Sequence, residues 1–181
     1  MVSTMSSSEK RPFAEVLPIA EGIVDELRPY CERIEIAGSL RRKKEMIGDI
    51  EIVMIPQETE GLFGGSKRDG ALLLALTASY RGWRRVKGGE WYQQYLVEGM
   101  TVDFFITTPE KWGCIFLIRT GSADFSRKVM TARSQGGLCP DHLKFWSGRL
   151  WDGDRALETP EEKDVFQALG LAFIAPEARA V

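Results

Sequence analysis

The stretch from Gly38 to Val53 constrains the fold of this chain more than any other segment. Residues 49–54 alternate carboxylates with apolar side chains, a pattern typical of a half-buried β-strand. Asp49 and Glu51 therefore share one face of the predicted strand, and Ile50, Ile52 and Met54 take the other. Two acids on one strand face provide the oxygen ligands of a two-magnesium phosphoryl-transfer site.

The residues just before this strand predict an anion site. Gly38 and Ser39 follow the apolar run 34–37, which favours a strand that ends in a turn and continues as a short helix. We expect Ser39 to cap that helix, whose free N–H groups attract phosphate. The basic residues 41–44 add positive charge beside it.

A third carboxylate is expected from a neighbouring strand. Asp103 lies in the apolar segment 100–106, where alternation directs it away from Val102, Phe104 and Ile106. An unpaired charge in such a strand is costly, so a bound cation is one reason for its presence. Solvated strand faces carry single acids too, but three acids on two strands favour a metal site.

Length and composition limit the remaining classes of protein. The 181 residues suffice for one domain or for two small lobes around a cleft, and 44% apolar with 28% charged residues is ordinary for a globular protein. No apolar run reaches the roughly 20 residues of a membrane span. Residues 1–10 predict a disordered leader and no signal peptide, so we expect a cytoplasmic, non-secreted protein without a membrane partner.

The cysteines and the histidine predict no further chemistry. Cys31, Cys114 and Cys139 are widely spaced, which disfavours a disulfide framework or a zinc site. His142 is the only histidine, and no nucleophile motif accompanies it. We interpret it as a surface or packing residue.

Periodicity predicts an α+β fold in two parts. Residues 11–108 are expected to form a mixed β-sheet with helices, and residues 109–181 a smaller α+β lobe. The expected helices cover 13–30, 39–44, 70–80, 109–118, 122–135 and 161–169. The expected strands cover 33–37, 49–55, 83–87, 91–97 and 100–107, with a loop over 57–70 and a small hairpin within 138–151.

Charge is unevenly distributed along the chain. The net charge is −2, yet residues 81–149 hold eleven Lys and Arg against six Asp and Glu. A basic second half is what a nucleic-acid groove needs, although a solvated charge distribution without a partner has the same composition.

Three segments, in order, resemble family X DNA polymerases, the group that includes DNA polymerase beta. The first is the Gly-Ser, basic turn and Asp-x-Glu pattern of residues 38–51, which also marks the wider nucleotidyltransferase superfamily. The second is the Thr-Gly-Ser segment at 119–126, and the third is the tail at 159–177, which is similar to the end of that family's thumb. The resemblance runs from about Phe13 to about Arg179.

The resemblance implies a nucleotidyltransferase palm over 11–108 and a C-terminal lobe that binds DNA and nucleotide. It implies a monomer that uses two Mg²⁺ or Mn²⁺ ions to add deoxynucleoside triphosphates to a DNA 3′-end at short gaps, as in repair. Asp49, Glu51 and Asp103 would hold the metals, and Asp103 would also accept the proton of the attacking hydroxyl. The implied nucleotide-binding residues are Gly38, Ser39, Arg42, Gly48, Arg119, Gly121, Ser122 and Ser126. Local charge and the thumb likeness together imply DNA contacts from Arg127, Lys128, Arg133 and Lys144.

The chain departs from the family pattern at several positions. Glu51 stands where Asp is usual, which related nucleotidyltransferases also accept. Ile118 and Arg119 replace the aromatic pair beside the incoming sugar, so weaker exclusion of ribonucleotides is expected. Ser126 and Met130 replace an Asn that reads the base and an Arg that contacts the template. No lyase or helix-hairpin-helix segment is recognised before Phe13, as in the reduced viral members of the family.

Two other functions remain open at this point. A different nucleotidyltransferase would act on a protein, an RNA end or a small molecule, as Glu51 and the pair Ile118–Arg119 allow. An inactive DNA-binding module is the second, and the intact Asp49 and Asp103 argue against it.

Overall fold

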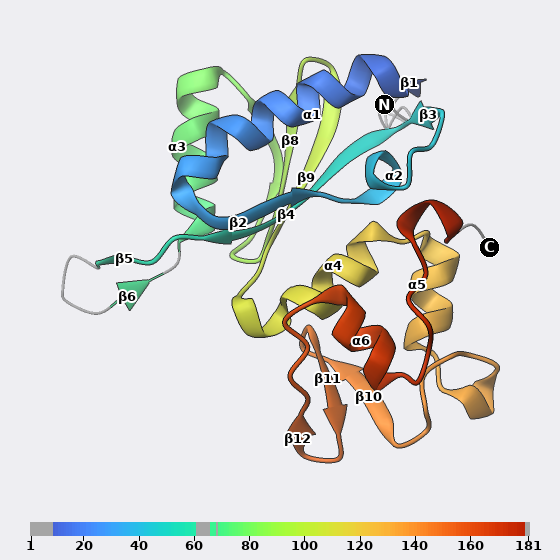
Figure 1. Cartoon of the computed structure of the whole chain (residues 1–181). Helices are drawn as coiled ribbons and strands as arrows, with labels where there is room; N and C mark the ends of the chain where they lie inside the picture. The colour runs from blue at the N-terminus through green and yellow to red at the C-terminus, as the bar shows by residue number, and fades with distance from the viewer. Residues whose placement is uncertain (1–8, 61–65, 68, 180–181) are drawn as a thin grey trace, which may run out of the picture.

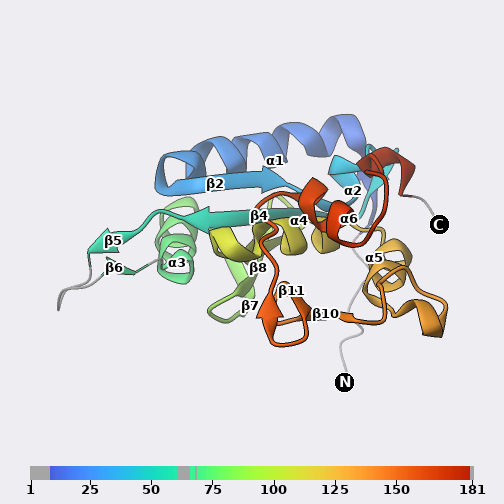
Figure 2. The same cartoon turned by 60° about the horizontal axis from the view of Figure 1, so that its bottom comes forward.

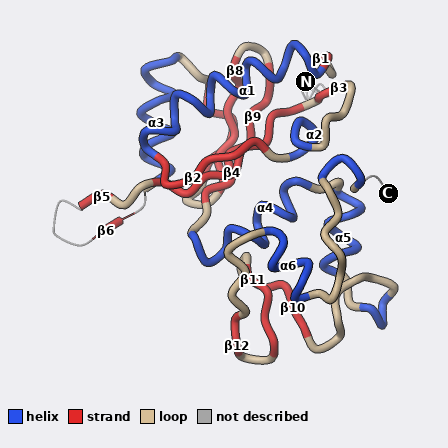
Figure 3. The backbone as a smooth tube through the Cα atoms, in the orientation of Figure 1, coloured by secondary structure: helices blue, strands red, loops and turns tan. Residues whose placement is uncertain are grey.

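A five-stranded sheet organises the first part of the chain in the computed structural model, which describes residues 9–60, 66–67 and 69–179. The strands β4 and β9 run parallel, and every other pair of neighbours is antiparallel, so the sheet is mixed as predicted. Figure 3 shows the strands of this sheet in red. Across the sheet the strands are β2 (Cys31–Ile36), β4 (Asp49–Pro56), β9 (Met100–Ile106), β8 (Tyr92–Val97) and β7 (Arg84–Gly88).

Two helices, α1 (Phe13–Leu27) and α3 (Gly70–Arg81), cover one face of this sheet (Figure 1). The apolar side of β4 packs beneath them, and Ile50, Ile52 and Met54 are fully buried in that core. Full burial of such side chains contributes about 1.5–3 kcal/mol each. The predicted alternation of β4 is therefore confirmed.

The predicted elements differ from the structure mainly at their ends. The helix expected over 13–30 finishes as a 3₁₀ turn, η1 (Arg28–Tyr30), because Pro29 cannot continue α-helical hydrogen bonding. Residues 57–70 contain a short hairpin of β5 (Thr59–Glu60) and β6 (Ser66–Lys67) instead of a plain loop. The predicted disordered leader falls largely on residues 1–8, outside the described part.

The turn from β2 into a short helix lies where the sequence predicted it, but the residue that caps this helix differs from the prediction. Helix α2 (Gly38–Arg41) is preceded by Ala37, and Ser39 lies inside it, so Ser39 is not the capping residue. Beyond α2, β3 (Met46–Ile47) pairs with β1 (Arg11–Pro12), a contact that the sequence pattern did not predict.

The C-terminal lobe, residues 109–179, has its own core between helices and a small sheet. Strands β10 and β11 form the predicted hairpin around Ser147 and Gly148, and β12 adds a third strand. The elements are η2 (Pro109–Lys111), α4 (Trp112–Thr120), α5 (Ala123–Met130), η3 (Arg133–Gln135), β10 (Leu143–Trp146), β11 (Arg149–Asp152), β12 (Arg155–Ala156), α6 (Glu162–Ala168) and η4 (Pro176–Ala178).

Helix α5 is shorter than predicted. It ends at Met130, not near Gln135, because Thr131 is extended and its carbonyl accepts the N–H of Cys139. Ala132 also forms an isolated β-bridge with Cys139. Pairing with the segment around Cys139 therefore replaces a further turn of helix after Met130.

A third apolar cluster joins the two lobes. Helix α4 lies against the sheet face opposite α1 (Figure 2), and its Trp112 and Phe116 pack on Val53, Ile55 and Phe105. The lobe joint is thus a buried contact between α4 and the strands β4 and β9.

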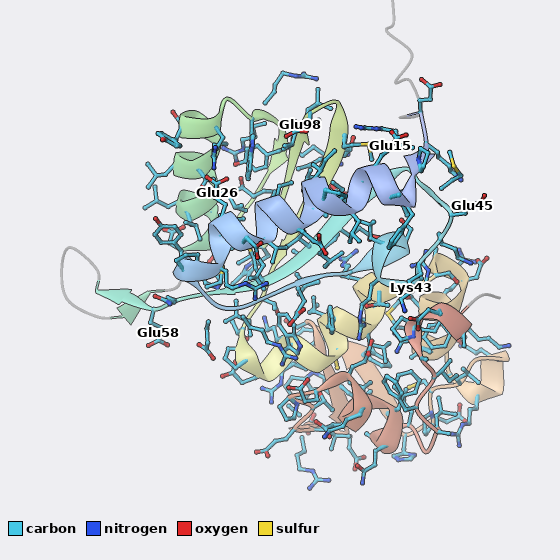
Figure 4. The ribbon with its side chains drawn as sticks, turned by 45° about the horizontal axis from the view of Figure 1, so that its top comes forward. Glu15, Glu26, Lys43, Glu45, Glu58 and Glu98 are labelled. Carbon is cyan, nitrogen blue, oxygen red and sulfur yellow. The ribbon has the colours of Figure 1, made fainter. Side chains whose placement is uncertain are left out.

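Ion pairs add to this joint along one edge. Arg33 pairs with Glu161 at 2.7 Å, and Lys43 with Glu177 at 2.9 Å. Figure 4 shows Lys43 beyond α2, at the border with the C-terminal segment. The third ionic contact joins the half-buried Arg41 to the buried residues Glu162 and Arg179.

Within the described ranges no helix has the length and apolarity needed to span a membrane.

Candidate active site

Two neighbouring strands bring the predicted carboxylates to one face of the sheet. β4 and β9 are parallel and in register, with Glu51 opposite Asp103 and Asp49 opposite Thr101. Since Ile50 and Val102 face the α1 side, the three acids face the side where α4 packs. All three are half-buried, near the end of the sheet where β2 passes into α2.

Burial and mutual repulsion act on two of these acids. Burial, followed by the charge of Asp49, raises the pKa of Glu51 to about 7, against the opposing effect of Arg42. Burial and the charge of Asp103 likewise raise the pKa of Asp49. Burial is the larger cause of both raised pKa values and like charge the second, so a bound cation would relieve the repulsion between these carboxylates.

The carboxylate of Asp103 has protein partners on the adjacent strand. The hydroxyl of Tyr92 and the side-chain amide of Gln94 both donate to its Oδ1, each at 2.7 Å. The sequence offered a bound cation as one reason for an acid in this strand, and the structure adds two hydrogen-bond donors to Asp103. Neither residue was predicted as part of the site.

Gly38 is required where α2 begins. Its φ is +61°, and a Cβ at this position would overlap the Glu51 carboxylate. Any side chain here would displace Glu51 from its place beside the α2 turn. The predicted Gly-Ser pattern thus has a direct steric basis, separate from phosphate binding.

Arg42 crosses the lobe joint beside the acids. One guanidinium nitrogen donates to the Thr120 carbonyl, and a Cβ on Gly121 would come within 2.9 Å of the same group. Burial lowers the pKa of Arg42, although Glu51 and Asp49 oppose the shift. Its Nε is buried without a hydrogen-bond partner, as is the hydroxyl of Ser39. Two buried donors without partners, one inside α2 and one just after it, fit an anionic ligand such as phosphate.

The donor set also fits hard divalent cations, which take carboxylate oxygens. As they stand, however, no three His, Cys, Asp or Glu side chains of the described residues are grouped closely enough to hold a metal ion. Asp103 is engaged by Tyr92 and Gln94, while Glu51 lies against Gly38. The three acids share a face without forming a closed cage.

Of the remaining predicted nucleotide-binding residues, one lies on the surface that carries the acids and three lie at the ends of helices or strands. Arg119 lies over the ring of Phe105 at 4.0 Å and influences Glu51 electrostatically, so it belongs to this surface. Gly48 immediately precedes β4, and Gly121 ends α4. Ser122 caps α5 and donates to the Arg179 carbonyl.

Two residues beside this surface face elsewhere. Ser126 is buried, with its hydroxyl donating to the carbonyl of Ile118 at 2.8 Å. Ile118 packs against the core of the C-terminal lobe. The structure therefore does not bring these two side chains to the acids.

The predicted DNA-binding residues are all exposed on the C-terminal lobe. Arg127 pairs with Asp124 on α5, and Arg133 donates to the Leu169 carbonyl at 2.7 Å, which links two segments of the lobe. Lys128 and Lys144 are exposed on α5 and β10.

Cavities lie on both sides of the joint. One of about 320 Å³ is lined by Tyr92, Phe105 and Arg119, and so borders the residues that contact Asp103. A larger one, of about 550 Å³, lies between α1, β2 and α2, away from the carboxylates. Size alone would point to the second, but only the first is next to the acids.

The raised pKa of Glu51 predicts a pH-dependent stability in metal-free buffer. The folded chain holds this proton up to about pH 7, against a usual value of 4.5, so stability falls as pH rises between them. We expect Glu51→Gln to remove up to about 3 kcal/mol of that fall. Urea unfolding at pH 5 and pH 8 with a chelator measures it. Glu35→Gln, on the exposed side of β2, is the control. If wild type and Glu51→Gln show the same change of stability with pH, the raised pKa does not belong to Glu51.

Comparison with known proteins confirms the resemblance to family X DNA polymerases. The family model described as DNA polymerase beta thumb matches residues 115–180. DNA polymerase lambda of Rattus norvegicus is 26% identical over 164 aligned residues, which cover 78% of this chain. The match spans only 28% of the length of that relative.

Proposed function

From this similarity to family X polymerases, we propose that the chain is a DNA polymerase that adds deoxynucleotides to a DNA 3′-end at short gaps. Residues 11–108 act as its palm and residues 109–181 as its thumb-like lobe. The carrying observation is the register of β4 and β9, which puts Asp49, Glu51 and Asp103 on one face beside Arg42.

Two divalent cations, Mg²⁺ or Mn²⁺, would be held by Asp49, Glu51 and Asp103. When bound, they supply charge stabilisation for an in-line phosphoryl transfer. The chain's own residues supply the rest. In this proposal Arg42 and the Ser39 hydroxyl receive triphosphate oxygens, which their buried, unpartnered polar atoms support, and Asp103 takes the proton of the 3′-hydroxyl.

The nucleotide and DNA would approach from the side of the lobe joint. The cavity bordered by Tyr92, Phe105 and Arg119 combines aromatic faces with a cation, as base stacking and phosphate contact require. Arg119 lies on this surface while Ile118 does not, so any weakened exclusion of ribonucleotides is attributed to Arg119.

Primer extension tests the proposal. Nicked, gapped and recessed DNA are supplied with each deoxy- or ribonucleotide, in Mg²⁺, Mn²⁺ or chelator. We expect metal-dependent addition, strongest on a short gap. Transfer only to a protein, an RNA end or a small molecule would replace this function with another nucleotidyltransferase activity, and no transfer at all would refute it.

DNA affinity should depend on salt through the C-terminal lobe. We expect the logarithm of the association constant to fall with the logarithm of salt concentration by about 0.9 per phosphate contact. Lys128→Ala and Lys144→Ala should each lower that slope by up to about 1, because both side chains are exposed. Lys163→Ala, exposed on α6 of the same lobe, is the matched control. A salt-independent affinity would contradict this interface.

A further inference from the structure

Both hydrogen bonds that the described residues make to the Asp103 carboxylate end on one oxygen. Tyr92 donates through its hydroxyl and Gln94 through Nε2, each 2.7 Å from Oδ1. Both donors come from β8, the antiparallel neighbour of β9, and Gln94 sits directly opposite Asp103 in the register. Tyr92 is two residues away and thus on the same face.

Neighbouring groups hold the two donors in place. The Tyr92 ring stacks on Phe105 with centroids 5.4 Å apart, and Arg119 lies over that same Phe105 ring. Gln94 is half-buried in the middle of β8, between two paired strands. These contacts restrict both side chains before any ligand arrives.

We propose that Tyr92 and Gln94 are positioning residues, which fix Asp103 through Oδ1 and so direct Oδ2 toward the reacting groups. The inference rests on the proposed function. The carboxylate torsion of an aspartate is broad and poorly defined when nothing restrains it. Two donors on one oxygen remove that freedom, and loss of comparable outer contacts usually costs 10–100-fold in metal affinity or activity.

The strand itself offers a matched control. Tyr95 lies on the opposite face of β8, where its buried hydroxyl donates to Gln93 Oε1 at 2.7 Å. Tyr92→Phe and Tyr95→Phe each delete one hydroxyl with one hydrogen bond from the same strand. Only the first touches the carboxylate, so a purely structural role would give both variants the same behaviour.

The experiment compares wild type, Tyr92→Phe, Gln94→Met, their double variant and Tyr95→Phe in the full chain. Mn²⁺ affinity is measured by electron paramagnetic resonance without substrate, and kcat and KM by single-nucleotide addition. We expect each single variant at the carboxylate to weaken Mn²⁺ binding and lower kcat about tenfold, and the double variant about a hundredfold. KM for the nucleotide should change little.

The two proposals fail in different ways. If wild type transfers nucleotide but Tyr92→Phe and Gln94→Met match Tyr95→Phe in Mn²⁺ affinity and kcat, the positioning role is refuted. If wild type transfers none, the proposed function is refuted, and the Mn²⁺ titration alone still decides whether these donors support a metal site at Asp103.

Discussion

Asp103→Asn and Asp49→Asn are each expected to abolish nucleotide transfer while the protein remains folded. Each change removes a metal-binding charge, and loss of one preorganised electrostatic group costs about 10²–10³-fold or more. Fold stability should hold or rise slightly, since burial and the charge of Asp103 raise the pKa of Asp49 and one source of repulsion disappears.

Gap filling and thermal unfolding, measured on the same preparations, check this result. Asp25→Asn is the control, because Asp25 pairs with Arg28 on the exposed side of α1, across the sheet from the acids. Retained transfer in Asp103→Asn would remove that residue from the reaction. A large fall in melting temperature would instead show that the carboxylate is structural.

Glu162→Gln is expected to destabilise the chain strongly. Glu162 accepts hydrogen bonds from two guanidinium nitrogens of Arg41, each at 2.9 Å, and from one nitrogen of Arg179 at 2.6 Å. Its side chain is 6% exposed and that of Arg179 is 0% exposed. Although burial opposes it, hydrogen bonds from Arg179 and Arg41 lower the pKa of Glu162. Removing the charge leaves two guanidinium groups unbalanced, which costs about 3–5 kcal/mol.

The adjacent residue supplies the control. Glu161 also forms a two-pronged pair, with Arg33, but its side chain is 44% exposed. Solvent screens such a pair, so Glu161→Gln should cost less than about 1 kcal/mol. Chemical denaturation of the two variants compares them directly. If both variants lose the same free energy of unfolding, burial does not distinguish these two neighbouring ion pairs.

Local patterns predicted the parts of the site that depend on one strand at a time. The alternation in β4 placed Asp49 and Glu51 on a common face, and the β9 segment placed Asp103 likewise. The Ser147–Gly148 turn was also predictable, because a Ser-Gly pair favours a tight hairpin turn, and both residues there adopt positive φ.

Contacts between distant strands and lobes could not be predicted in this way. Tyr92 and Gln94 reach Asp103 only because β8 pairs with β9 in one register, which no local pattern specifies. Glu161 and Glu162 are identical in type, yet tertiary packing buries one and leaves the other half-exposed. Ser39 looked like a cap because the sequence does not reveal that the helix starts one residue earlier.

The contact between Arg42 and the Thr120 carbonyl has a thermodynamic consequence. One guanidinium serves the lobe joint and faces the acids, with a buried Nε still unsatisfied. An anion that strengthens this arrangement tightens the joint, and an anion that draws Arg42 away loosens it. By linkage, any effect of nucleotide on lobe association equals the effect of lobe association on nucleotide affinity. A substitution confined to the joint can therefore alter affinity without touching the ligand.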